Sequence, residues 1–374
     1  MPRKTRQTPA ASIPARHFEK YLAGETPPSH ETMRRLYALA GDFHALHPWD
    51  FLLEHHLVAV EAPQPGELCF CSLMGALQQV FSFHAYLGAD GYHFFRKLHS
   101  GESFTIGDFF AGQHAINVEF VPSAELTAAD RQLLKALRHP FGKGFRAPKF
   151  RSMRPGYHPW YVTEQEALIL TTCLAAFLGF FHLLQANPDA GYWDKKGVYP
   201  LVSRRRGDGQ AGYSVRPMAA PAKTVKLPRL PELDETRIRR IREARPPSRG
   251  AVDVDHFYGA SMVGEAHERK ACVRLAIAID SETAFAFPPE VGSPESSVGD
   301  LLAEVVLTAI ESSGALPSEL RVKSREYKSV LGPLAKALGT PVKVVKSLPA
   351  ADFARDQLLR MMSDPGRIDA GLTR

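Results

Sequence analysis

The longest apolar stretch of the chain, residues 167–184, contains no Asp, Glu, Lys or Arg. Its apolar residues fall on every side of a helix, which is typical of a helix buried in a protein core or in lipid. Thr163 and Glu166 have the spacing of a capping box, and the proline of Asn187-Pro188 cannot continue a helix. The pattern therefore predicts a buried helix from about residue 163 to 186, around which a domain is organised.

A membrane-spanning helix is the alternative, because about 18 apolar residues are the lower limit for crossing a bilayer. Polar residues interrupt the stretch at Thr171, Thr172 and His182, and neither flank is clearly basic. The basic residues near the N-terminus are not followed by an apolar core, so they do not resemble a signal peptide. The four cysteines are too few for a disulfide framework in a chain of this length. We therefore expect a soluble, cytoplasmic protein with no membrane contact.

In the residues before 163, some segments have the hydrophobic period of a helix and others have that of a strand. An amphipathic helix is expected at 30–46, strands at 57–61, 67–73, 80–87 and 116–121, and a further helix at 127–137. Turn residues between the first three strands indicate an antiparallel meander. Residues 142–161 show no clear period and are expected to be irregular. Residues 198–204 and 212–218 predict a hairpin.

After residue 250, strands and helices alternate more regularly. Strands are expected at 252–263, 272–279, 284–287, 320–323 and 342–345, and helices at 298–312, 327–338 and 350–362. The resulting order is β-β-β-α-β-α-β-α, and its alternating second half indicates parallel strands joined by right-handed crossovers. This order resembles that of the ribonuclease H-like fold.

These elements predict an α/β protein with two domains. The expected parts are a basic disordered tail at 1–25, an N-terminal α+β domain with the meander and the buried helix at 26–217, a linker rich in Pro and Arg with a short basic helix at 218–250, a C-terminal α/β domain at 251–364, and a tail at 365–374. The composition of the linker is typical of extended segments.

Positive charge is concentrated in one segment. Residues 203–250 hold 13 Lys and Arg against five Asp and Glu, whereas the whole chain has a formal net charge of +6. Contact with nucleic acid, or with an acidic protein, is therefore expected in this segment. The arginines expected to make it are Arg204, Arg205, Arg206, Arg237, Arg239, Arg240 and Arg242. The alternative is a solvated helix that binds nothing.

Residues 142–161 combine cations with aromatic rings. The candidates for binding are Tyr157, His158, Trp160 and Tyr161. Such residues bind nucleic acid by phosphate pairing and base stacking. They serve equally as core residues that pack the central helix against its sheet. A third interpretation is a small-molecule pocket beside them in the N-terminal domain.

Common catalytic motifs are absent from the sequence, which has no Gly-x-Ser-x-Gly, Walker or dinucleotide-binding motif. The resemblance to the ribonuclease H-like fold implies one enzymatic alternative, a nuclease or phosphoryl-transfer enzyme whose carboxylates hold divalent metal ions. Asp280, Glu304 and Asp352 are its candidate catalytic residues. The expected strand at 320–323 lacks the carboxylate that this fold places there, so the site would be degenerate. No other cofactor is expected.

Three stretches resemble a family of uncharacterised bacterial proteins with two successive domains of unknown function. Residues 49–91 and the sequence Pro155-Gly156-Tyr157-His158-Pro159-Trp160-Tyr161-Val162-Thr163 are similar to its first domain, and residues 275–280, 320–321 and 331–339 are similar to its second. The Pro-Gly-Tyr-His-Pro-Trp sequence is the most specific of these. The resemblance implies two domains and supplies no catalytic residue. We therefore expect a non-enzymatic binding or adaptor protein that contacts a polyanion through residues 203–250.

Overall fold

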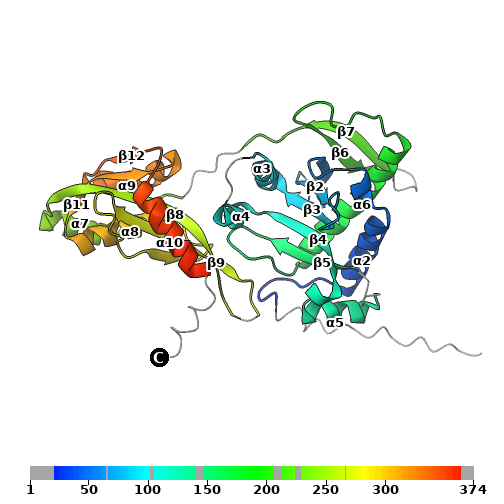
Figure 1. Cartoon of the computed structure of the whole chain (residues 1–374), viewed down its shortest axis with the longest axis horizontal. Helices are drawn as coiled ribbons and strands as arrows, with labels where there is room; N and C mark the ends of the chain where they lie inside the picture. Colours follow the sequence, from blue (N-terminus) through cyan, green and yellow to red (C-terminus); the bar gives the residue numbers. More distant parts are fainter. Residues whose placement is uncertain are drawn as a thin grey trace, which may run out of the picture.

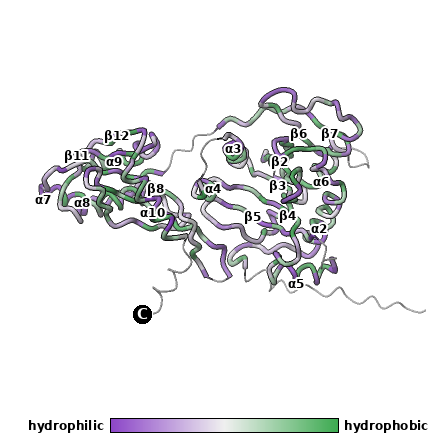
Figure 2. The backbone as a smooth tube through the Cα atoms, viewed as in Figure 1, coloured by the Kyte–Doolittle hydropathy of each residue, from purple (hydrophilic) through white to green (hydrophobic). Residues whose placement is uncertain are grey.

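The computed structural model describes residues 21–64, 66–101, 105–139, 146–205, 212–223, 229–265 and 267–363. Within these residues, the helices and strands form two parts, each with its own sheet (Figure 1). Apolar residues gather in the interior of each part, and the outer loops are more polar (Figure 2). The prediction of an α/β protein with two folded parts is confirmed.

A seven-stranded sheet forms the N-terminal part, with the strand order β5-β4-β3-β2-β1-β6-β7. Its strands are β1 (Val58–Glu61), β2 (Leu68–Met74), β3 (Ser82–Leu87), β4 (Ala115–Pro122), β5 (Arg146–Met153), β6 (Val198–Arg204) and β7 (Tyr213–Ala219). The first three strands form the expected antiparallel meander, and β4 and β5 continue it as antiparallel neighbours. β6 lies parallel to β1, and β7 returns as the second strand of the expected hairpin.

β5 corrects the expectation that residues 142–161 are irregular. Pro148, Phe150 and Ser152 are buried, whereas Lys149 and Arg151 between them are only half-buried, so one face of the strand lies on the core. Pro148 lies on this buried face and pairs with Phe120 of β4. A proline is compatible with an edge strand, because no hydrogen bond is lost where its missing N–H would face outward. β5 is an edge of the sheet.

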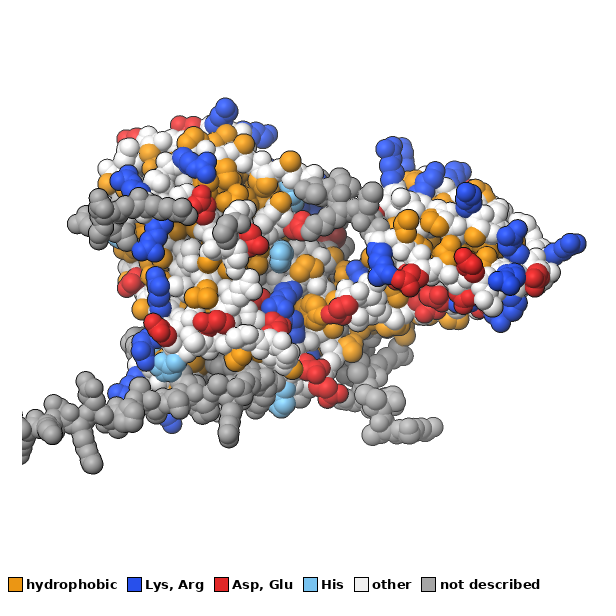
Figure 3. Space-filling view, turned by 180° about the vertical axis from the view of Figure 1, so that it is seen from behind, with side chains coloured by type: hydrophobic (Ala, Val, Ile, Leu, Met, Phe, Trp, Pro, Cys, Tyr) orange, Lys and Arg blue, Asp and Glu red, His pale blue; other side chains and the backbone are white. Residues whose placement is uncertain are grey.

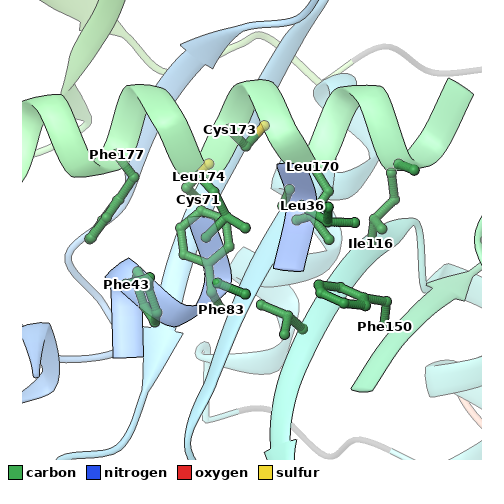
Figure 4. Packing of buried hydrophobic residues seen from close by; sticks show 14 of the residues in the cluster. Leu36, Phe43, Cys71, Phe83, Ile116, Phe150, Leu170, Cys173, Leu174 and Phe177 are labelled. Carbon is green, nitrogen blue, oxygen red and sulfur yellow. The ribbon is translucent and has the colours of Figure 1, made fainter. Parts of the chain in front are cut away.

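The central helix is α6 (Glu164–Ala186), and it begins at the expected capping box. The Thr163 side chain accepts a hydrogen bond from the Glu166 N–H, and the Glu166 carboxylate accepts one from the Thr163 N–H. α6 and α2 (His30–Ala45) cover one face of the sheet, where Phe177 contacts Phe43 and Phe83 (Figure 4). By length and composition α6 could cross a membrane, but most of it is buried within the protein, as expected for a core helix.

The remaining helices of this part are α3 (Gly88–Leu98), α4 (Ile106–Gly112) and α5 (Ala128–Leu137), with the short turns η1 (Pro48–Asp50) and η2 (Ser123–Glu125). α3 packs on the opposite face of the sheet from α6, where Tyr92 and Phe95 contact Phe70 and Tyr86. The sheet is therefore covered by helices on both faces.

A five-stranded sheet forms the C-terminal part, with the strand order β10-β9-β8-β11-β12. Its strands are β8 (Ser248–Val263), β9 (Ala271–Asp280), β10 (Glu290–Gly292), β11 (Leu316–Val322) and β12 (Val342–Val344), and its helices are α7 (Glu235–Ala244), α8 (Val298–Ser313), α9 (Arg325–Leu338) and α10 (Pro349–Ser363). β9 is antiparallel to β8 and β10, whereas β11 is parallel to β8 and β12. The expected β-β-β-α-β-α-β-α order is confirmed, and the assignment to a ribonuclease H-like fold stays a prediction.

The third strand of the C-terminal part, β10, begins later in the sequence than expected. Residues 284–287 form one bridge, between Ile279 and Ala286, and β10 follows the prolines at 288 and 289. Ala284 has a φ of 57° and belongs to a turn that begins at Asp280. This turn includes Ala284, the first residue of the segment that the alternation assigned to a strand.

The alternation of β9 separates the two faces of the five-stranded sheet. Ala276 and Ala278 face the core formed by α8 and α9, whereas Leu275, Ile277 and Ile279 face α10. Ile238 and Ile241 of α7 are buried in the core of α8 and α9. α7 is therefore part of the C-terminal fold, although it lies in the segment expected to be a linker.

The N-terminal fold likewise begins before residue 26. Leu22 is buried in the core of α6, and Glu25 forms an ion pair with Arg154. The expected tails lie otherwise outside the described residues, at 1–20 and from 364 onward.

Candidate functional site

The two parts meet at the Pro-Gly-Tyr-His-Pro-Trp sequence, which follows β5. The N–H of Cys272 donates a hydrogen bond to the Gly156 oxygen at 2.8 Å, and the N–H of His158 donates to the Lys270 oxygen at 2.8 Å. Tyr157 and Ala271 form an antiparallel bridge between these bonds. The start of β9 therefore pairs with the N-terminal part, and the β8–β9 hairpin reaches across to it (Figure 1). We call this region, residues 155–158 with 269–272, the seam.

Gly156 is required at the seam for two reasons. Its φ is +81°, a left-handed conformation that other residues rarely adopt. A Cβ at this position would also lie 2.6 Å from the Cβ of Pro294, which belongs to the C-terminal part. The glycine therefore permits both the turn and the close approach of the two parts.

Arg269 carries charge from the C-terminal hairpin into the N-terminal part. Its side chain is only 8% exposed. It donates hydrogen bonds to the oxygens of Ser152 and Tyr161, and its Nε lies 3.9 Å from Glu25 Oε1. Burial lowers the pKa of the Arg269 guanidinium to about 10, and the nearby charge of Arg154 contributes. With a pKa of about 10, the Arg269 guanidinium stays protonated at neutral pH.

Arg154 completes this charged group from the N-terminal side. Its guanidinium binds Glu25 at 2.6 and 3.0 Å and Glu166 at 2.9 and 3.0 Å. Burial raises the pKa of Glu166, but Arg154 and the hydrogen bonds from Ser152 and Thr163 outweigh it, so the pKa of this carboxyl lies below its usual value. The capping residue of the central helix thus belongs to the same charged group as Arg269.

The four aromatic candidates are used within the fold. Tyr161 is buried, its hydroxyl lies 2.9 Å from the Thr127 hydroxyl, and Arg151 lies over its ring. Trp160 donates a hydrogen bond to the Tyr21 oxygen, and His158 packs on Phe110. Tyr157 pairs with β9 at the seam. None of the four is fully exposed, so the exposed stacking surface expected for nucleic acid is not formed by these rings.

A cavity lies in the N-terminal part near the seam, but Tyr157, His158, Trp160 and Tyr161 do not line it, so a pocket beside these four residues stays a prediction. Its volume is about 870 Å³, within the ~300–1,000 Å³ typical of ligand sites. Its walls come from β2, the first turns of α3 and α6, and the charged group of Glu25, Arg154 and Glu166. Apolar wall residues include Leu68 and Ile169.

The three candidate catalytic carboxylates do not form one site. Glu304 of α8 binds Arg237 of α7 at 2.6 Å, on the face of the sheet covered by α8 and α9. Asp352 is on α10, which covers the opposite face. Asp280 accepts hydrogen bonds from the N–H groups of Glu282 and Thr283, within its own turn. Among the described residues, no group of three or more His, Cys, Asp or Glu side chains is placed to hold a metal ion.

Two buried aspartates of β8 were missed. Asp253 and Asp255 are 3% and 5% exposed and lie on the face of the sheet covered by α10. Arg355 of α10 lies 3.2 Å from Asp255 and 3.0 Å from Asp352, and Lys323 forms ion pairs with the same two carboxylates. The cations of Lys323 and Arg355 thus occupy the space between the acids. The alternation of Val252, Asp253, Val254 and Asp255 was a signal for these residues.

The pKa values of both buried aspartates are raised by their burial. Lys323 and Arg355 partly oppose this effect at Asp255, and Ser281 donates a hydrogen bond to Asp253. Lys323 and Arg355 offset part of the charge of the three carboxylates of Asp253, Asp255 and Asp352. The geometry gives no support to the nuclease alternative.

The arginines of residues 203–250 divide into two groups. Arg237 and Arg240 bind Glu311 of α8 at 2.8 and 2.7 Å, so they attach α7 to the C-terminal fold. Arg239 and Arg242 are exposed on the outer side of α7 and have no ion pair within the described part of the chain. Arg204 and Arg205 are exposed at the end of β6, and Arg206 lies outside the described residues.

These observations define a two-part α/β protein whose parts are joined by a shared strand pairing and a buried arginine. A family model described as "Domain of unknown function (DUF7309)" matches residues 34–199, and one described as "Domain of unknown function (DUF6930)" matches residues 237–359. The two matches follow each other along the chain, an arrangement that is consistent with a family of proteins that contain both domains. Comparison with curated proteins found no match.

Replacing Arg269 with Ala should loosen the seam, because the oxygens of Ser152 and Tyr161 lose a charged donor and Glu25 loses a nearby opposite charge. Each lost hydrogen bond to a charged group is worth about 1.5–3 kcal/mol, so amide hydrogen exchange at His158 and Cys272 should accelerate roughly tenfold or more. Glu268→Ala, a change at an exposed neighbour, serves as the control. Unchanged exchange in Arg269→Ala would show that backbone pairing alone holds the seam.

Replacing Asp253 with Asn should change how stability depends on pH. A carboxyl with a raised pKa favours folding when it is protonated, and this contribution is lost as pH rises through the folded-state value. Asp253→Asn should therefore gain stability relative to the parent protein between about pH 4 and pH 7. Asp280, whose pKa is lowered by hydrogen bonds from Thr283, should show the opposite trend as Asp280→Asn. Urea denaturation across this pH range measures the unfolding free energy of both variants. If both variants changed in the same direction with pH, the raised pKa of Asp253 and the lowered pKa of Asp280 would be contradicted.

Proposed function

We propose that the protein is a cytoplasmic, non-enzymatic binding or adaptor protein that contacts nucleic acid through the arginines of residues 203–250. The observation that carries the proposal is that the arginines of α7 fall into two groups, one bound to the fold and one exposed. Arg237 and Arg240 fix the helix to α8, and Arg239 and Arg242 project outward without acidic partners among the described residues. A helix held rigidly in this way presents its free cations at fixed positions, which lowers the entropy lost on binding phosphate.

The exposed arginines of the β6–β7 hairpin extend the basic character to the N-terminal part. Arg204 and Arg205 are exposed, and Arg216 of β7 makes only a 3.7 Å contact with Glu61. Exposed cations gain affinity for a polyanion by releasing its counterions. An acidic protein is the other partner that these charges suit.

A double substitution of Arg239 and Arg242 by Glu tests the proposal. Binding of labelled single-stranded DNA or RNA to the full chain should weaken at least tenfold, and the slope of log affinity against log salt should fall by about 2. Arg34→Glu with Arg35→Glu is the matched control, because both residues are exposed on α2 and the charge change is the same. No binding by the parent protein, or equal loss in both variants, would contradict the proposal.

The cavity beside the seam supports a second candidate function, the binding of a small molecule by the N-terminal part. Ala89, in the first turn of α3, lines the cavity, and Ala89→Phe would fill part of it. A compound that raises the melting temperature of the parent protein should not raise that of the variant. Failure of every member of a broad metabolite collection to shift the melting temperature would count against this function.

A further inference from the structure

β12 is an open edge of the five-stranded sheet. It pairs with β11 on one side, and no described strand lies on its other side. The edge strand consists of Val342, Lys343 and Val344, and Val344 is 37% exposed. Unpaired N–H and C=O groups along a sheet edge are a template for a further strand.

The hydrogen bonds to β11 show which groups of β12 face outward. The Pro341 oxygen accepts from the Leu320 N–H at 2.8 Å, and the Val345 N–H donates to the Val322 oxygen at 2.9 Å. Residues two apart in a strand direct their backbone groups to the same side. Lys343 therefore bonds towards β11, and the N–H and C=O groups of Val342 and Val344 point away from the sheet.

A groove of about 770 Å³ runs along this edge, between β12 and the first turns of α9. Arg325 and Lys328 line it from the helix, and Lys343 lines it from the strand. All three side chains are exposed and lack an ion pair within the described residues. Glu319 is the one acid of the lining, and it binds Arg321 at 2.6 Å. Lys and Arg side chains are visible along this margin of the C-terminal part (Figure 3).

We propose that this groove binds an extended acidic segment of a partner protein, which adds to β12 as a sixth strand. The backbone of the segment bonds to the outward groups of Val342 and Val344, and its carboxylates pair with Arg325, Lys328 and Lys343. Charge complementarity selects an acidic segment, since three cations line the groove and none of them forms an ion pair among the described residues. The proposal is independent of nucleic-acid binding by α7, which uses other residues.

A polypeptide fits this surface better than nucleic acid does. The outward groups of β12 are alternating amide donors and carbonyl acceptors, which match the spacing of another strand. The exposed side chain of Val344 offers an apolar contact to an alternate residue of that strand. A phosphate backbone would satisfy the cations but leave the carbonyl oxygens of the edge without donors.

Fluorescence anisotropy with the full-length chain tests the proposal. The first probe is a labelled eight-residue peptide in which Glu alternates with Val or Thr. The second probe has the same sequence, but alternate backbone amides are N-methylated. The first peptide should bind, and the second should bind at least tenfold more weakly because it cannot pair with β12. Val344→Pro removes an outward N–H from the edge and should also weaken binding at least tenfold, whereas Lys343→Glu with Lys328→Glu should abolish it.

Two double variants outside the groove serve as controls. Arg34→Glu with Arg35→Glu should leave peptide binding unchanged, and Arg239→Glu with Arg242→Glu should also leave it unchanged. If Val344→Pro does not fold, the N-methylated peptide decides the outcome without any change in the protein. Equal binding of both peptides, or no binding of either, would overturn the proposal. Displacement of the labelled peptide by single-stranded nucleic acid at lower concentrations than unlabelled peptide requires would also overturn it.

Discussion

The burial of Arg269 beside the Glu25 carboxylate and the backbone oxygens of Ser152 and Tyr161 constrains much of this molecule. A buried guanidinium needs acceptors and a nearby opposite charge, and here Ser152 and Tyr161 accept its hydrogen bonds while Glu25 lies 3.9 Å from its Nε. Glu25 also binds Arg154, which in turn binds the capping residue of α6. The position of the C-terminal hairpin and the start of the central helix are therefore set by one network of charges.

The C-terminal part contains a second group of buried charges. Its sheet carries two aspartates on an interior face, where carboxylates are costly to bury. Lys323 follows β11 and Arg355 lies on α10, so the parallel pairing of β11 with β8 and the packing of α10 bring both cations to the acids. These cations offset part of the charge of the buried carboxylates.

Local signals predicted most of the architecture. The capping box at Thr163, the apolar stretch of α6 and the regular alternation after residue 250 located the helices and the order of the strands. β5 was not predicted, because it contains a proline, Pro148, and several cations, and only pairing with β4 reveals the strand. The grouping of side chains was predicted least well. Glu304 and Asp352 lie on opposite faces of a sheet, and the sequence gives no measure of which face a helix will cover. The contact between Gly156 and Pro294 joins residues far apart in the chain, so no local pattern could reveal it.

The strand pairing at the seam bears on how the two halves remain together. Gly156 and Cys272 lie on either side of the segment that connects the sheets, so the chain closes a loop when they meet. A covalent tether keeps the two surfaces at a high effective concentration, which lets a modest contact area hold them in register. Cleavage of the tether would not by itself part the halves, since their mutual affinity would then decide whether they dissociate on dilution.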